Sequence, residues 1–148
     1  MTRPPMQPPA DQPIGFWTFR AGEAIRARIR GALEESGVAQ PEWWVLHQLS
    51  RYPDGVDRAV VVETIGSNDT PAAIESAIDG AVEKGWIRVD GAALHLSEVG
   101  TERFERAAAV QKVLHEERMR GITTEEYATT ISVLQRTITN VGGEAWHW

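Results

Sequence analysis

Few residues of this chain stand at spacings that could support catalysis. The four histidines share no metal-ligand spacing, and the segment that starts at His115 departs from the zinc-protease pattern at Met119, where that pattern requires a second histidine. The sequence has no cysteine nucleophile and no glycine-rich phosphate loop. Adjacent carboxylates such as Glu116 and Glu117 point apart on a helix and are typical of a solvated face. We therefore predict no enzyme, no metal site and no cofactor.

The composition indicates one globular domain that is not attracted to nucleic acid over its whole surface. At 148 residues, with 42% hydrophobic and 24% charged residues, the chain can bury a single core. Its net charge of −6 leaves room only for a local basic patch. The longest apolar runs stop at four residues, and no signal peptide is recognisable. We expect a cytoplasmic protein without membrane contact.

The stretch from residue 70 to residue 100 is the element around which the rest is arranged. Thr70 can cap a helix that starts at Pro71 and ends before Gly85. Two short strands then flank Asp90-Gly91, a dipeptide that tolerates positive φ at both centres of a two-residue hairpin turn. A helix followed by a tight hairpin is the outline of a winged helix. The apolar residues of the helix recur with a period near 3.6, at Ile74, Ile78, Ala81 and Val82.

Four segments precede this unit. Residues 1–13 hold five of the eight prolines and are predicted to form a flexible arm. A long amphipathic helix is expected over residues 14–36, and a second begins at Pro41, with Trp43, Leu46 and Leu49 on its inner stripe. Residues 58–65 are expected to form a helix, although their run of β-branched valines could equally form a strand.

Two helices follow the hairpin. Ser97 can cap a helix over residues 98–120, and Thr123 with Glu126 gives the capping box of a final helix. The chain ends in an aromatic tail, residues 142–148. Apolar residues of the final helix alternate at spacings of four and three, a heptad seam that needs a partner helix. They are Tyr127, Ile131, Leu134, Ile138 and Val141.

The order of these motifs resembles the MarR (multiple antibiotic resistance regulator) family of bacterial transcription factors. The strings AIDGAVEKGWIRV and LHLSEVG carry the resemblance, with WWVLHQL upstream and GITTEE before the last helix. The resemblance implies a mainly α fold with a small β-hairpin wing, in a single winged helix-turn-helix domain over residues 14–141. It places the DNA-binding lobe at residues 41–96, between the dimerisation helices of residues 14–36 and 98–141. It also implies a homodimer.

The resemblance makes the helix after Thr70 the recognition helix, yet its charge is wrong for a polyanion. Residues 67–85 carry four acids against one lysine, a net charge of −3. The wing is shorter than is typical of the family and has one basic residue. The polar candidates can read base edges or simply cap turns. The predicted DNA-binding residues are Arg51, Arg58, Ser67, Asn68, Thr70, Ser76 and Arg88.

Members of this family bind small aromatic or phenolic ligands between the dimerisation helices and the DNA-binding lobe. The corresponding residues here are an aromatic set with one titratable donor, which suits a flat anion or a phenol. Two of these residues also fall on predicted core stripes, so a packing role stays open. The predicted ligand-binding residues are Phe16, Trp17, Phe19, Trp43, Trp44 and His47.

Two functions follow from the sequence. The first is a dimeric MarR-type transcriptional regulator that binds double-stranded DNA and responds to a small aromatic ligand. The alternative is a dimer of the same fold that has lost DNA binding and acts as a ligand-binding or protein-interaction module. The family resemblance favours the first function, whereas the acidic recognition helix and the short wing favour the second.

Overall fold

The computed structural model describes residues 2–147, and this part of the chain is mainly helical with a small antiparallel sheet. The fold class predicted from the sequence is therefore confirmed. The helices are α1 (Ile14–Ser36), α2 (Gln40–Ser50), α3 (Arg58–Ile65), α4 (Pro71–Glu83), α5 (Glu98–Arg118) and α6 (Thr124–Asn140). The strands are β1 (Val56–Asp57), β2 (Ile87–Asp90) and β3 (Ala93–Leu96), and they lie in the order β1-β3-β2. Short 3-10 turns occupy Pro9–Asp11 and Gly66–Asn68.

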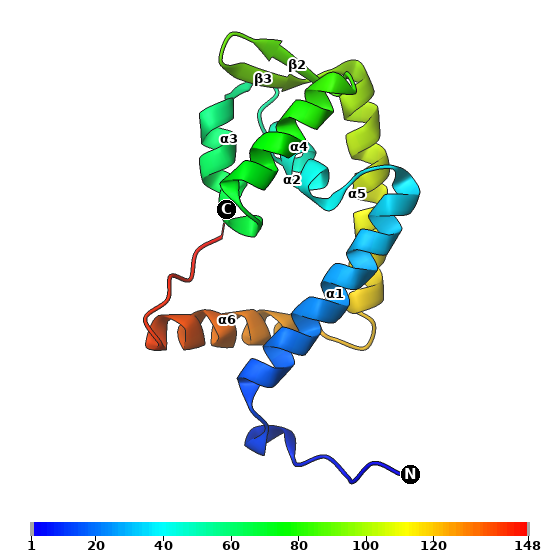
Figure 1. Ribbon diagram of the computed structural model, residues 1–148. Helices are drawn as coiled ribbons and strands as arrows, with labels where there is room; N and C mark the ends of the chain where they lie inside the picture. Colours follow the sequence, from blue (N-terminus) through cyan, green and yellow to red (C-terminus); the bar gives the residue numbers. More distant parts are fainter. Residues whose placement is uncertain (1, 148) are drawn as a thin grey trace.

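Figure 1 shows a lobe and a set of long helices that extend from it. The lobe consists of α2, α3, α4 and the sheet. Helix α5 starts beside the sheet, packs along α2 and then runs beside α1, which extends below the lobe. Helix α6 runs across the far end of this pair. Among the helices in residues 2–147, none combines the length and hydropathy needed to cross a membrane.

The core lies in the lobe. Ile74 and Ile78 of α4 are fully buried against Leu46 of α2 and against α3, which contributes Val61 and Ile65. Each such side chain contributes about 1.5–3 kcal/mol when it is removed from water. The lobe therefore holds α4 in one rotational setting.

Helix α2 differs from the predicted stripe. Leu46 and Leu49 are buried as expected, but Trp43 is only half-buried, and Val45 and Gln48 are buried in addition. The reason is that α2 packs against α4 on one side and α5 on the other, so more than one face is covered.

The predicted caps are present. The Thr70 hydroxyl accepts from the Ala73 backbone N–H at 3.1 Å, and Ser97 accepts in the same way from Gly100 at 2.9 Å. Thr123 and Glu126 form the reciprocal capping box. Each cap satisfies N–H groups that a helix leaves unpaired at its start.

Residues 58–65 form helix α3, which resolves the alternative that the sequence left open. Strand β1, directly before α3, was not predicted. It has only two residues, with Val56 opposite Leu94 of β3, and so short a strand leaves no alternating pattern in the sequence.

The predicted hairpin turn is wrong by one residue. Asp90 pairs with Ala93, so the two loop residues are Gly91 and Ala92. Gly91 has φ +60°, and no residue other than glycine has positive φ in the described chain, which fits a turn with positive φ at its first centre only. The register is set by burial, because it places both Ile87 and Leu94 in the core.

The long helices bury little of their apolar surface. Leu33 is the one fully buried residue of α1, and no residue of α6 is buried within residues 2–147. Most of the apolar face of α1 and the heptad seam of α6 are thus left without full cover in the single chain. The more exposed large side chains of α1 are Ile14, Phe16, Trp17, Phe19 and Ile25, and those of α6 are Tyr127, Ile131, Val133 and Ile138.

Gly100, in the first turn of α5, has no room for a side chain. A Cβ atom at this position would overlap the Trp86 carbonyl oxygen and lie 2.8 Å from its carbonyl carbon. We expect Gly100→Ala to lower the free energy of unfolding by about 3 kcal/mol. Gly80→Ala is the control: it meets no atom within 4 Å, and in a helix it should raise stability by about 0.5–1 kcal/mol. Urea unfolding of both variants measures this, and equal effects would contradict the packing described here.

Candidate nucleic-acid interface

Helix α4 presents one uncovered face. Its core residues Ile74, Ile78 and Ala81 are turned inward, which leaves the opposite row exposed. This row consists of Ala72, Ser76, Asp79 and Glu83. The exposed face of α4 therefore carries two small side chains and two acidic ones.

Arg58, at the start of α3, is bound to two carboxylates of α4. Its Nε donates to Glu75 Oε2 at 2.7 Å, and its Nη2 donates to Asp79 Oδ1 at 2.7 Å and to the Glu75 carbonyl at 3.2 Å. The bonds to Glu75 and then Asp79 raise the pKa of Arg58. We call these three residues the Arg58 cluster. Its arginine, predicted to meet DNA, is thus engaged within the protein.

Lys84 is engaged as well. Its Nζ lies 2.6 Å from Glu42 Oε2 on α2 and 4.6 Å from the centre of the Trp86 ring. Glu42 is only 7% exposed and also accepts from the Ala39 backbone N–H. The single lysine of residues 67–85 therefore neutralises a buried carboxylate instead of adding charge to the exposed face of α4.

The structure leaves two predicted cations accessible. Arg51 follows α2 and Arg88 lies in β2, and both are exposed without an ion pair in residues 2–147. Ser67 and Asn68 occupy the 3-10 turn before Thr70. Three polar candidates, Ser67, Asn68 and Thr70, thus lie at the start of α4, and Ser76 lies midway along it, whereas the two accessible arginines are on other elements.

A hollow of about 590 Å³ separates α3 from the start of α4. Ser67 and Thr70 line it together with three acids, Glu63, Asp69 and Glu75. Sequence reasoning counted Asp69 and Glu75 but not Glu63, and it missed the pairing of Glu75 with Arg58, because these two residues are 17 positions apart and no local pattern connects them.

The aromatic set predicted to bind a ligand forms two groups in the single chain. Phe16 packs edge-on against Trp17 at 5.2 Å on the exposed end of α1. Phe19 is about 21 Å along the helix axis from Leu33, where α1 enters the core. The whole set therefore does not line one pocket within a chain, and the ligand site stays a prediction.

The second group lies on α2. Trp43 stacks on Phe104 of α5 with ring centres 5.6 Å apart, and His47 lies 5.4 Å from Trp43, while Trp44 is half-buried. Phe104 was not among the predicted ligand residues. Burial lowers the pKa of His47 below its ordinary value of 6.5, and the positive charges of Arg51 and then His147 lower it further.

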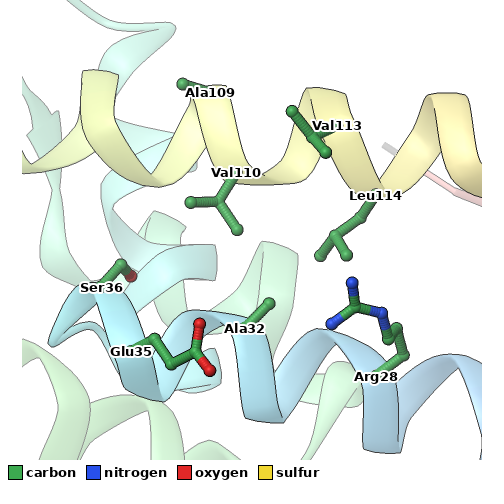
Figure 2. Close-up of a pocket in the computed structure, with 8 residues that line it drawn as sticks. All are labelled: Arg28, Ala32, Glu35, Ser36, Ala109, Val110, Val113 and Leu114. Carbon is green, nitrogen blue, oxygen red and sulfur yellow. The ribbon is translucent and has the colours of Figure 1, made fainter.

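A groove of about 440 Å³ lies between α1 and α5 (Figure 2). Figure 2 shows Val110 and Leu114 of α5 facing Ala32 of α1 across it. Arg28 stands at one end, where its Nε lies 3.1 Å from Glu117 Oε2. Apart from Val113, the groove includes none of the large exposed apolar residues of the long helices.

Comparison with known proteins gives a result at the level of structure. No family model matches the sequence, and no curated protein does. A MarR family protein of Mycobacterium tuberculosis in complex with DNA matches 90% of this chain and 100% of its own, at 22% identity and a TM-score of 0.67. CouR from Rhodococcus jostii bound to p-coumaroyl-CoA matches 88% of this chain and 94% of its own, at 23% identity and a TM-score of 0.72.

The chain has the MarR winged-helix fold. A MarR family regulator from a Rhodococcus species agrees, matching 88% of this chain and 94% of its own at 24% identity and a TM-score of 0.71. At such identities the similarity establishes the fold, and at that level it confirms the resemblance seen in the sequence. In this fold, α4 occupies the position of the recognition helix, and β2 with β3 the position of the wing.

His47 should make stability depend on pH. Because its pKa is lowered in the folded chain, the unfolded chain takes up the proton first as pH falls through about 6.5. Folding stability should therefore decrease from pH 7.5 to pH 5, and His47→Gln should remove that part of the decrease. Arg51→Gln removes one cause of the shift and should give an intermediate slope. Urea unfolding at several pH values measures this, and an unchanged slope in His47→Gln would refute it.

Proposed function

We propose that this protein is a dimeric MarR-type transcriptional regulator that binds double-stranded DNA through α4 and the wing. The observation that carries the proposal is the match to a DNA complex over 90% of this chain. In addition, the face of α4 that enters the major groove in winged helices is uncovered here. Helices α2 and α3 support α4 for such a contact, because they pack against its inner face.

The exposed apolar surface supports a dimer. Ile131 and Ile138 on the seam of α6 are 39% and 41% exposed, and Phe19 on α1 is 67% exposed. Several large apolar side chains exposed on one helix, as on α6, are typical of an interaction site. A second copy is the partner that the heptad spacing of α6 favours.

The accessible cations and polar groups suggest the DNA contacts. Arg88 on the wing and Arg51 after α2 are free to meet phosphates, while Ser67, Asn68 and Ser76 lie where base edges would pass α4. With so few cations, the affinity should depend more on base contacts than in a basic regulator.

A second candidate is a dimer of this fold that no longer binds DNA. The Arg58 cluster and the Lys84–Glu42 ion pair favour it, because both withhold cations from the acidic face of α4. Such a protein would act through ligand or protein binding.

DNA binding can be tested with a mobility-shift assay on the DNA upstream of the protein's own coding sequence. Wild-type protein should shift this duplex at low salt, and the affinity should fall steeply as salt rises. Arg88→Gln and Arg51→Gln should each weaken binding and reduce the salt slope by about one. Salicylic acid, which is bound in a structure of the M. tuberculosis protein, is the ligand to add, and it should weaken the shift.

Arg120→Gln is the control for these variants, because Arg120 lies in the turn between α5 and α6, away from the lobe. It should bind as the wild type does. If the wild-type protein gives no shift even at low salt, the second candidate replaces the first.

The dimer can be tested through the seam of α6. Ile131→Glu places a charge among Tyr127, Leu134 and Ile138 and should convert the protein to monomer, because a buried unpaired carboxylate opposes association. Thr129→Glu adds the same charge on the opposite face of α6 and should leave the dimer intact. Sedimentation velocity measures both. A monomeric wild type, or dissociation by both variants, would contradict the proposed interface.

A further inference from the structure

The Arg58 cluster resembles a protein–phosphate contact in which carboxylates replace the phosphate. The guanidinium fork binds carboxylates and phosphates by the same pair of parallel N–H bonds. Here Nε and Nη2 of Arg58 are both directed to oxygens of Glu75 and Asp79, at 2.7 Å each. The two acids stand one helical turn apart, so both carboxylates reach a single arginine on α3.

The cluster borders a hollow beside the wing. A second hollow, of about 480 Å³, separates the start of α3 from the wing and is lined by Arg58, Glu75, Val89 and Gly91. The cluster is also open to solvent, because the side chains of Arg58 and Asp79 are 33% and 69% exposed. A phosphate that approached between α4 and the wing would therefore compete with the two carboxylates for the same guanidinium.

We propose that Glu75 and Asp79 act as internal competitors for Arg58, and that they determine specificity by withholding it from phosphates. The protein in this state offers fewer cations to any DNA backbone, so its non-specific affinity is low. A DNA site must then gain its binding energy from base edges, or bind tightly enough to displace the carboxylates. The biological meaning rests on the proposed DNA-binding function, whereas the competition itself is a property of the chain.

The size of the effect follows from counterion release. One additional phosphate contact makes the dependence of log affinity on log salt steeper by about 0.9. Removing two acids also lowers the general repulsion of DNA, so the contribution of Arg58 must be separated from that of net charge. Two other exposed acids, Glu63 and Glu83, lie on α3 and α4 without a pairing partner in residues 2–147, and they provide the matched control.

The experiment is a double-mutant cycle measured by fluorescence anisotropy with a random-sequence 30-base-pair duplex at several potassium chloride concentrations. Glu75→Gln with Asp79→Asn should raise non-specific affinity on the order of tenfold at low salt and make the salt slope steeper by about one. Arg58→Gln added to that pair should remove most of the gain, whereas Arg58→Gln alone should change little. Glu63→Gln with Glu83→Gln makes the same change in net charge and should give a smaller gain with an unchanged slope.

Two results would overturn the proposal. One is an equal gain in the control pair, and the other is a gain that persists without Arg58, since either would mean simple charge repulsion. Circular dichroism and thermal unfolding of each variant establish that it is folded before binding is measured. The result is independent of the operator assay: an Arg58-dependent gain together with no binding to the upstream DNA would retain the competition and reject the regulator.

Discussion

Burial of the apolar face of α4 is the constraint on which the rest of the structure depends. Ile74 and Ile78 have no exposed surface, so the helix has one rotational setting, and the row of Ala72, Ser76 and Asp79 must face outward. The backbone of Trp86 then connects the end of α4 to the wing and to α5. Its N–H donates to the Ala81 carbonyl, and its carbonyl accepts from the Ser97 N–H, both at 2.9 Å. The position of the wing thus follows from the position of α4.

Two of the basic side chains in the lobe form ion pairs with acids of the same chain. Arg58 neutralises acids on α4, and Lys84 neutralises the largely buried Glu42. A buried carboxylate without a partner is strongly destabilising, so Lys84 stabilises the fold by pairing with Glu42. The ion pairs of Arg58 contribute less to stability, because they are more exposed to solvent. This difference is why we assign a functional role to the Arg58 cluster and a structural role to the other pair.

Sequence reasoning predicted the parts that depend on local patterns. The caps at Thr70 and Ser97, the period of α4 and the wing as a hairpin all follow from neighbouring residues, and the structure confirms them. The predicted turn was off by one residue. The pairing register depends on which side chains are buried in the core, whereas the dipeptide Asp90-Gly91 reflects only a local turn preference. The ion pairs were missed for a similar reason, since Arg58 and Asp79 are 21 positions apart.

The lobe and α6 differ in how much of their apolar surface the single chain buries. The lobe closes its own core, whereas α6 has a capping box and good apolar spacing but no buried residue in the described chain. In proteins most of the stability of an amphipathic helix comes from packing of its apolar face. The C-terminal tail, residues 144–147, lines a groove along the apolar face of α6 but buries none of the helix's residues, so this face still needs further cover. The heptad spacing, which a lone surface helix has no need of, makes a second helix the natural cover. The exposed apolar side chains of α1, among them Phe16 and Phe19, need cover for the same reason.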